Sequence, residues 1–157
     1  MFTYRKATID DISILTELRI EFLKEVKGAD LENKNDMYYN IEKYLNNHIT
    51  DESFIAWLCV FENEVIATSG ISFYEVPPSH SNITGKIGYI MNMYTKKPYR
   101  RKGIASILFE KIIEEGLERK VGKLSLHASK DGKSLYQKYG FIENNDEMVF
   151  YKFRRDK

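Results

Sequence analysis

The sequence contains a single cysteine and no long hydrophobic run. Cys59 has no second cysteine with which to form an internal disulfide or a cysteine metal cluster. We therefore expect a protein of the reducing cytoplasm and interpret Cys59, which lies in an apolar run, as a core residue. No segment approaches the roughly 20 apolar residues of a membrane helix, and the N-terminus lacks the basic-then-apolar layout of a signal peptide. These absences argue against a membrane-bound or disulfide-stabilised protein.

The sequence also lacks a dominant charge and a histidine cluster. Charged residues make up 30% of the chain, yet the formal net charge is only +1. A dedicated nucleic-acid-binding protein would show a strong basic excess, so no nucleic acid is expected as a partner. The three histidines, His48, His80 and His127, are scattered without metal-ligand spacing. We therefore expect no metal site.

The 157 residues, of which 43% are hydrophobic, suffice for one compact domain. No linker, internal repeat or low-complexity tract divides them, so residues 1–157 are interpreted as a single domain. Apolar residues recur at helical spacing in some segments and at strand spacing in others. The predicted order is β-α-α-β-β-β-α-β-α-β, an α/β domain with a mixed sheet. The predicted strands are Phe2–Lys6, Phe54–Phe61, Val65–Val76, Ile83–Thr95, Lys123–Ala128 and Met148–Phe153, with a further short strand considered near Phe141. The predicted helices run from Asp10 to Gly28, from Tyr38 to His48, from after Pro98 to Leu117, and over Lys133–Tyr139.

The most informative segment is the basic turn between the strand that ends at Thr95 and the helix that follows. The helix begins at Gly103, where unpaired N–H groups and the helix dipole attract an anion. Gly103 and Ala105 are small, so a ligand can approach the backbone closely. This arrangement is suited to a pyrophosphate. The alternative is a capped helix whose basic residues form a solvated surface. The basic residues concerned are Lys96, Lys97, Arg100, Arg101, Lys102 and Lys111.

Two motifs in this part of the chain resemble those of the GCN5-related N-acetyltransferase (GNAT) family. The first is Arg100-Arg101-Lys102-Gly103-Ile104-Ala105, which resembles the family's Arg/Gln-x-x-Gly-x-Gly/Ala signature. The second is Leu135-Tyr136-Gln137-Lys138-Tyr139-Gly140-Phe141, which resembles its Leu-Tyr-x-x-x-Gly-Phe pattern. The resemblance extends over nearly the whole chain. It is most specific between Met91 and Phe141.

The resemblance implies a mixed, mostly antiparallel sheet whose fourth and fifth strands splay apart to admit acetyl-coenzyme A as cosubstrate. The backbone of Met93, Tyr94 and Thr95 would then bind the pantetheine arm as an added strand. The pyrophosphate would lie on the amides of Arg100, Arg101, Lys102, Gly103, Ile104 and Ala105. The family's asparagine after the fifth strand is absent here, so Ser134 or Lys133 is expected to contact the cofactor instead.

The resemblance also implies a reaction, in which an acetyl group passes by direct attack in a ternary complex to a primary amine of a small molecule or peptide. Tyr136 is the candidate proton donor to the departing thiolate; the alternative is that it only packs its helix. Glu75 is one candidate base, while Asn92 and His127 could orient a water or the substrate. The acceptor side is expected at the first two helices and the hairpin at 76–82. The acidic residues there, which suit a cationic amine or form an ordinary solvated surface, are Glu21, Glu25, Asp30, Glu32 and Asp36.

Two other functions stay open at this point. A non-catalytic sensor would bind acyl-coenzyme A but release no thiol, and a plain interaction domain would not bind it. The sequence names neither the acceptor nor the base, and a homodimer is compatible with the resemblance.

Overall fold

The computed structural model describes residues 1–27, 33–144 and 146–151. The chain forms two compact units, residues 1–127 and residues 128–157, and each is described by itself. Among the described residues, the first unit holds the five strands and three of the α-helices. In chain order these are β1 (Thr3–Lys6), α1 (Ile12–Lys27), α2 (Lys34–Thr50), β2 (Phe54–Phe61), β3 (Glu64–Glu75), β4 (Lys86–Thr95), α3 (Ile104–Glu118) and β5 (Lys123–Leu126). Two short 3₁₀ helices, Ile9–Asp11 and Lys97–Tyr99, precede α1 and α3.

The five strands form one sheet in the order β1-β2-β3-β4-β5. The first three neighbouring pairs are antiparallel. The last pair, β4 and β5, is parallel because α3 carries the chain back between them. This confirms the predicted mixed, mostly antiparallel sheet and the predicted order of elements from the first strand to the helix after β5.

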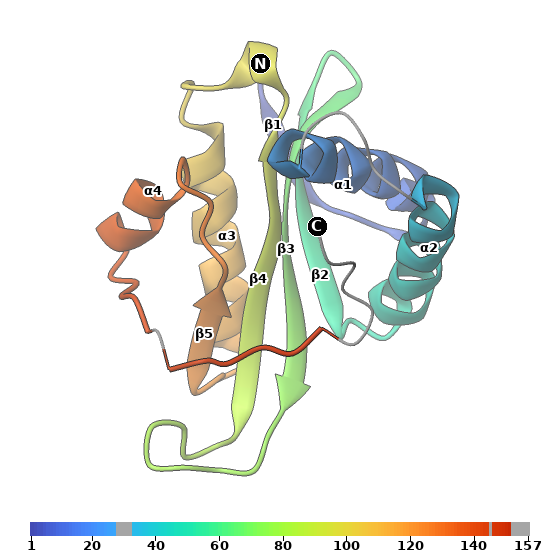
Figure 1. Ribbon diagram of the computed structural model, residues 1–157. Helices are drawn as coiled ribbons and strands as arrows, with labels where there is room; N and C mark the ends of the chain where they lie inside the picture. The colour runs from blue at the N-terminus through green and yellow to red at the C-terminus, as the bar shows by residue number, and fades with distance from the viewer. Residues whose placement is uncertain (28–32, 145, 152–157) are drawn as a thin grey trace. The chain divides into compact units, whose positions relative to one another are not determined.

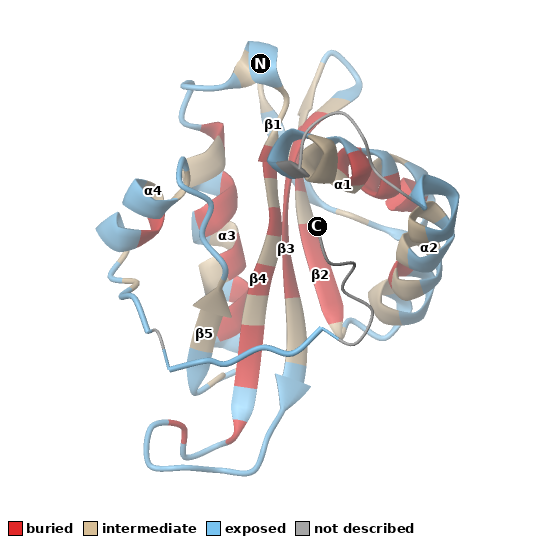
Figure 2. Cartoon of the chain, in the orientation of Figure 1, coloured by how far each residue is buried: buried red, intermediate tan, exposed pale blue. Residues whose placement is uncertain are grey.

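Helices cover both faces of the sheet in the first unit (Figure 1). On one face α1 and α2 pack on a core that includes Leu15, Leu45 and Phe54. On the other face α3 packs on a second core around Cys59, Ile66 and Leu108. Cys59 is fully buried there, as its apolar surroundings predict. Figure 2 shows that buried residues concentrate in the central strands and on the helix faces turned toward them.

The start of α1 is fixed by polar contacts to β1. Thr8 forms a capping box with Asp11, whose carboxylate accepts a hydrogen bond from the Thr8 amide. Arg5 of β1 donates two hydrogen bonds to the same carboxylate, at 2.8 and 2.9 Å. The guanidinium of Arg5 is the main reason that the pKa of Asp11 lies below its ordinary value. These contacts hold the helix that carries the residues of the site described below.

The described part of the second unit contains one short helix, α4 (Lys133–Lys138), and the residues after this helix differ from expectation. Gly140, with φ 93°, turns the chain, and the amide of Phe141 donates to the carbonyl of Tyr136. The strand expected at Met148–Phe153 is wrong for residues 148–151, which have no regular structure; residues 152–153 lie outside the described residues. No strand forms at Phe141 either. The apolar residues at 148–151 are exposed. They therefore do not pack as a strand of the sheet, although their apolar pattern predicted one.

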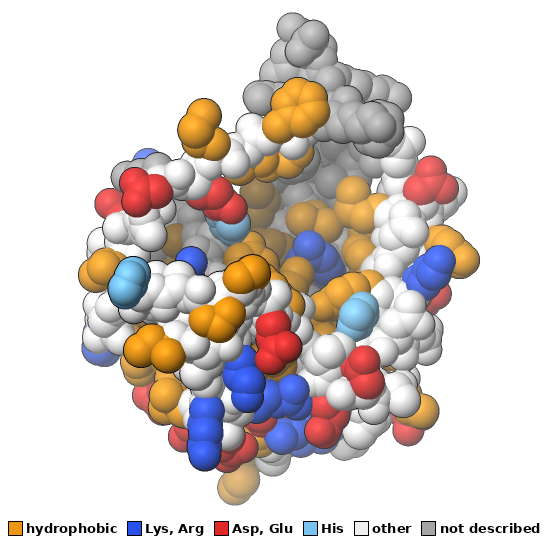
Figure 3. Space-filling view, turned by 90° about the horizontal axis from the view of Figure 1, so that it is seen from below, with side chains coloured by type: hydrophobic (Ala, Val, Ile, Leu, Met, Phe, Trp, Pro, Cys, Tyr) orange, Lys and Arg blue, Asp and Glu red, His pale blue; other side chains and the backbone are white. Residues whose placement is uncertain are grey.

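The surface carries both charges in close proximity. Figure 3 shows Lys and Arg side chains directly beside Asp and Glu side chains on the face seen from below. Neither sign dominates this face, in agreement with the net charge of +1.

Candidate functional site

The two halves of β4 have different neighbours. Residues Ile87–Ile90 pair with β5 through Lys123–Leu126, and this pairing ends at the partners Ile90 and Leu126. β4 continues to Thr95, where it pairs with β3 alone. The backbone of the second half of β4 therefore has an edge without a strand partner among the described residues.

A β-bulge lies at the start of this open half. Thr68 is the partner of Tyr94 and Gly70 is the partner of Met91, so Asn92 and Met93 together oppose Ser69. Asn92 has φ 56°, a left-handed conformation that asparagine tolerates better than most residues. The extra residue changes the alternation of side chains. Met91 and Tyr94 consequently share the face covered by α1, whereas simple alternation predicted opposite faces.

The turn that follows β4 exposes backbone amides. The short 3₁₀ helix Lys97–Tyr99 leads into Arg101, with φ 63°, and then Gly103, with φ 80°. Gly103 is the N-cap of α3 and makes no side-chain cap hydrogen bond. An added Cβ at Gly103 would meet no atom within 4 Å. The helix thus begins at an open position with unsatisfied N–H groups.

Arg100 at the start of the signature is held by α1 and by β4. Its Nε donates to the carbonyl of Thr95 at 2.7 Å, and its Nη2 contacts both carboxylate oxygens of Glu25 at 3.0 and 2.8 Å. The hydroxyl of Tyr94 donates to Glu25 at 3.0 Å and to Glu21 at 3.4 Å. Burial, together with the Glu25 carboxylate, raises the pKa of Tyr94 to about 12, so this phenol stays protonated.

Glu25 is therefore engaged in a structural contact. Partial burial acts to raise its pKa, but the hydrogen bonds from Arg100 and Tyr94 prevail, and the pKa lies below its ordinary value. The sequence offered Glu21 and Glu25 as acceptor-side residues; the structure joins both to the open half of β4. Asp36 lies in the first turn of α2, while Asp30 and Glu32 lie outside the described residues.

A cluster of polar side chains lies between the sheet and the two N-terminal helices. Arg19 of α1 donates to the Oδ1 of Asn92 at 2.5 Å. Tyr44 of α2 donates to Ser72 of β3 at 3.0 Å. Tyr89 of β4 is hydrogen-bonded to Nδ1 of His127, which follows β5. Two residues considered from the sequence thus belong to these contacts. Asn92 faces α1, and His127 lies directly after β5.

Arg19 was missed by the sequence interpretation, although a signal existed. It lies four residues after Leu15 and three before Phe22, on the apolar stripe of α1. A charged residue in such a stripe indicates either a buried ion pair or a functional position.

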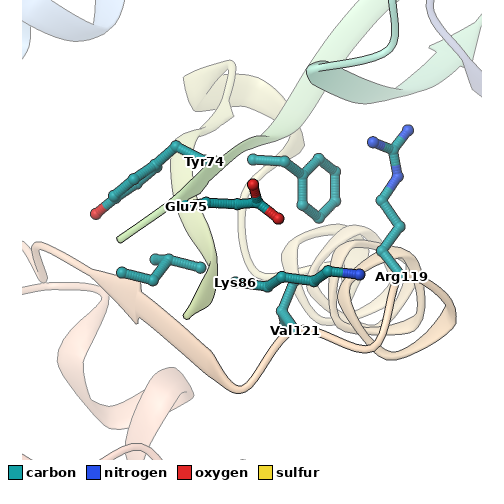
Figure 4. A pocket seen from close by; sticks show the side chains of 7 residues that line it. Tyr74, Glu75, Lys86, Arg119 and Val121 are labelled. Atoms are coloured by element: carbon teal, nitrogen blue, oxygen red, sulfur yellow. The ribbon is translucent and has the colours of Figure 1, made fainter. Parts of the chain in front are cut away.

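Glu75 is not brought together with these residues. It pairs with Lys86 at the opposite end of β4, six residue steps from Asn92, which is roughly 20 Å at ~3.3 Å per residue. Glu75 and Lys86 line a shallow pocket of about 390 Å³ with Tyr74, Arg119 and Val121. Figure 4 shows the Glu75 carboxylate on the Lys86 side and the Tyr74 ring pointing the other way.

Tyr136 lies on α4 in the second unit. Its side chain is buried, and burial raises the pKa of its hydroxyl above the ordinary value. Its amide and carbonyl belong to the turns that begin and end the helix. Ser134 lies on the same helix, and Lys133 at its start forms an ion pair with Glu143.

Comparison with known proteins decides the family. The model of the Acetyltransferase (GNAT) family matches residues 15–141. The chain belongs to the GNAT acetyltransferase family. This confirms the resemblance seen in the two motifs, and the protein is an acetyltransferase.

Two solved GNAT structures are similar over almost the whole chain. A predicted acetyltransferase from Clostridium acetobutylicum, crystallised with acetyl-CoA, is 35% identical over 96% of each chain, with a TM-score of 0.90. A GCN5-related N-acetyltransferase from Ralstonia eutropha JMP134 is 27% identical, covering 96% of this chain and 98% of that one, with a TM-score of 0.88.

A more distant structure shares the GNAT fold alone. Glucosamine-6-phosphate N-acetyltransferase from Arabidopsis thaliana is 17% identical over 97% of this chain and 99% of that one, with a TM-score of 0.68. No curated protein sequence matches the chain.

Two further properties concern the described part of this GNAT chain. None of its helices is long and apolar enough to cross a membrane. Within the same residues, no group of three or more His, Cys, Asp or Glu side chains is arranged to hold a metal ion.

Proposed function

We propose that this acetyltransferase transfers an acetyl group from acetyl-CoA to a primary amine of a small molecule or peptide, by direct attack within a ternary complex. The observation that carries the proposal is the open half of β4, which leads directly into the amide-rich turn at the start of α3. A relative at 35% identity was crystallised with acetyl-CoA, which supports the same cosubstrate here.

The turn fits a pyrophosphate. Arg101 and Gly103, on either side of Lys102, both have a left-handed backbone, and left-handed residues are a feature of anion-binding loops. Apart from the chain directly beside Gly103, no protein atom lies within 4 Å of the position a Cβ would take, which leaves room for a phosphate near the amides. In this proposal Arg100, Arg101, Lys102, Gly103, Ile104 and Ala105 bind the pyrophosphate.

The open edge of β4 fits the pantetheine arm. Its peptide-like amides can pair with the backbone of Met93, Tyr94 and Thr95, which has no strand partner on the β5 side among the described residues. The bulge at Asn92 bends the strand at this point. An amide of Met93 or Tyr94 is then available to stabilise the negative charge that develops on the thioester oxygen. Ser134 is proposed as a further contact to the cosubstrate.

Acetyl-CoA supplies the activated acetyl thioester. The acceptor nitrogen, after losing its proton, uses its lone pair to form a bond to the acetyl carbon. The carbon–sulfur bond breaks, the electron pair leaves with sulfur, and the thiolate takes up a proton, while the nitrogen releases one N–H proton as it becomes the amide. We assign that proton to the hydroxyl of Tyr136, whose raised pKa keeps it protonated at neutral pH. We assign the orientation of the acceptor to Asn92, at the bulge.

Two measurements test the proposal. Calorimetric titration of acetyl-CoA into the purified protein should show binding at one site, and thiol detection should show release of coenzyme A with amine acceptors. Binding without thiol release for any amine would indicate a sensor of acyl-CoA. Absence of binding by folded protein would contradict the proposed function altogether.

A further inference from the structure

The polar cluster beside the β4 bulge contains a cation without an anionic partner. The ion pairs of the described residues each join a basic side chain to a carboxylate. They are Arg5–Asp11, Lys6–Glu115, Lys96–Glu64, Arg100–Glu25, Arg119–Glu52 and Lys133–Glu143. Arg19 is absent from this set, although it is partly buried between α1 and the sheet. Its only side-chain hydrogen bond within the described structure goes to the neutral amide of Asn92.

This arrangement is unusual for a guanidinium. Charged groups that are withdrawn from water are nearly always paired, because the loss of hydration is otherwise uncompensated. Burial lowers the pKa of Arg19, which marks this loss, yet a guanidinium keeps its charge at neutral pH. If this position served only the stability of the fold, an apolar residue of similar size would be at least as favourable as arginine.

The unused donors of Arg19 are accessible. A guanidinium has five N–H donors, and the contact to Asn92 uses only the Nη1 group. None of the fully buried side-chain nitrogen or oxygen atoms in the described residues lacks a hydrogen-bond partner. The Nε and Nη2 atoms of Arg19 have no such partner, so they must reach solvent-accessible space. Both atoms therefore keep N–H donors that no hydrogen bond in the described residues uses.

The surroundings of Arg19 favour a single negative charge. Its neighbours one helical turn away, Leu15, Thr16, Phe22 and Leu23, are uncharged. The nearby hydroxyls of Tyr44 and Tyr89, from α2 and β4, can donate or accept hydrogen bonds. One planar guanidinium in a neutral setting matches a carboxylate, whereas a phosphate dianion would favour additional cations.

From these contacts we infer that the amine acceptor carries a carboxylate, as an amino acid or a peptide with a free C-terminus does, and that Arg19 binds this carboxylate beside the bulge. The inference rests on the proposed acetyl transfer and specifies its acceptor. The carboxylate is held by Arg19, the residue that also contacts Asn92, so the acceptor is anchored next to the part of β4 where transfer is proposed. Glu25, the carboxylate of α1 nearest to the end of β4, is engaged by Arg100 and Tyr94.

The test compares matched acceptors that differ only in the carboxylate. Thiol release is measured with lysine and lysinamide, with glycine and glycinamide, and with a short peptide bearing a free or an amidated C-terminus. The inference expects kcat/KM at least about tenfold higher for the acid of a pair, the range typical of a hydrogen-bonded charge pair. Arg19→Gln should abolish this preference by raising the KM of the acid, while the KM of acetyl-CoA stays unchanged. Arg19→Lys should retain part of it.

Controls separate the possible failures. Lys43→Gln removes an exposed cation on α2 and should leave the preference intact. Thermal unfolding of each variant identifies a loss of folding. Equal use of acids and amides by the wild type, or an unchanged preference in a folded Arg19→Gln variant, would overturn the inference while leaving acetyl transfer established. Absence of thiol release with every amine would contradict both.

Discussion

The two halves of β4 differ in every property that matters for function. The half that ends at Ile90 is regular, and its residues Ile87–Ile90 have strand neighbours on both edges. The half from Met91 to Thr95 has β3 on one edge only, contains a bulge, and leads into a turn with two left-handed residues. Polar contacts to α1, from Asn92 and Tyr94, occur in this second half.

The comparison shows how one strand can combine a structural part, which is paired on both edges, with a part that is available to a ligand. Pairing on both edges fixes the position of the first half. The second half continues from this fixed part, and the backbone N–H and C=O groups on its other edge have no strand partner among the described residues. These groups can bind a ligand. We therefore expect substitutions in and after the second half to affect binding and turnover. Substitutions near Lys86, where β4 begins, should not affect them.

The largest effect is expected from Gly103→Glu. A carboxylate at the N-terminus of α3 would repel the pyrophosphate, and a side chain at φ 80° would strain the turn. We expect acetyl-CoA affinity to fall about 100-fold or more, a loss of about 2.7 kcal/mol. Calorimetric titration measures it.

Two further variants separate strain from charge. Gly103→Ala adds a Cβ where no atom lies within 4 Å and should weaken binding far less. Gly140→Glu introduces comparable strain at another left-handed glycine, φ 93°, without changing the charge of the turn. Retained affinity in a folded Gly103→Glu protein would remove the turn from the proposed site.

The next effect tests the proposed proton donor. Tyr136→Phe removes only the hydroxyl, so the proposed proton donor is lost while the ring is kept. We expect kcat to fall by about 100-fold, the lower part of the range for general acid catalysis, with little change in acetyl-CoA affinity. Steady-state kinetics beside calorimetry checks both, and an unchanged kcat would leave Tyr136 with a packing role.

Much of this architecture could be predicted from the sequence. Apolar periodicity located α1 and α3, and continuous apolar runs located the central strands, because burial on one or two faces imposes those patterns. The basic turn before Gly103 was also visible, since helix starts and glycines have local signatures. The strand expected at residues 148–151 was wrong because an apolar run does not specify whether a partner strand exists.

The parts of the candidate site that were missed depend on contacts between distant residues. The bulge arises from the pairing of Asn92 and Met93 against Ser69, and no local pattern distinguishes it from regular alternation. The link of Arg100 to Glu25 spans 75 residues of sequence. Such contacts follow from the packing of α1 on β4.

A smaller effect is expected from Asn92→Gly, which keeps the backbone of the bulge but removes the amide that Arg19 contacts. The KM of the acceptor should rise roughly tenfold, as for the loss of one charged hydrogen bond, with acetyl-CoA affinity retained. Asn92→Ala should in addition reduce stability, because alanine is strained at φ 56°. Kinetics and thermal unfolding of the two variants distinguish the effect of losing the side chain from the effect of straining the backbone. Equal kinetics for wild type and Asn92→Gly would show that the side chain does not orient the acceptor.

The smallest effect is expected at the other end of the strand pair. Glu75 is exposed and lies opposite Lys86, about 20 Å from Asn92 along a strand of ~3.3 Å per residue. A general base must lie within hydrogen-bond reach of the proton it removes, directly or through one water. Glu75→Gln should therefore change kcat by less than about twofold, in keeping with the small energies of exposed charges. A pH–rate profile of this variant is the sharpest measurement, because loss of a catalytic base would remove its acidic limb. A large fall in kcat with an altered acidic limb would place the chemistry at the half of β4 that is paired on both edges. It would then be this half, and not the open half, that carries the site.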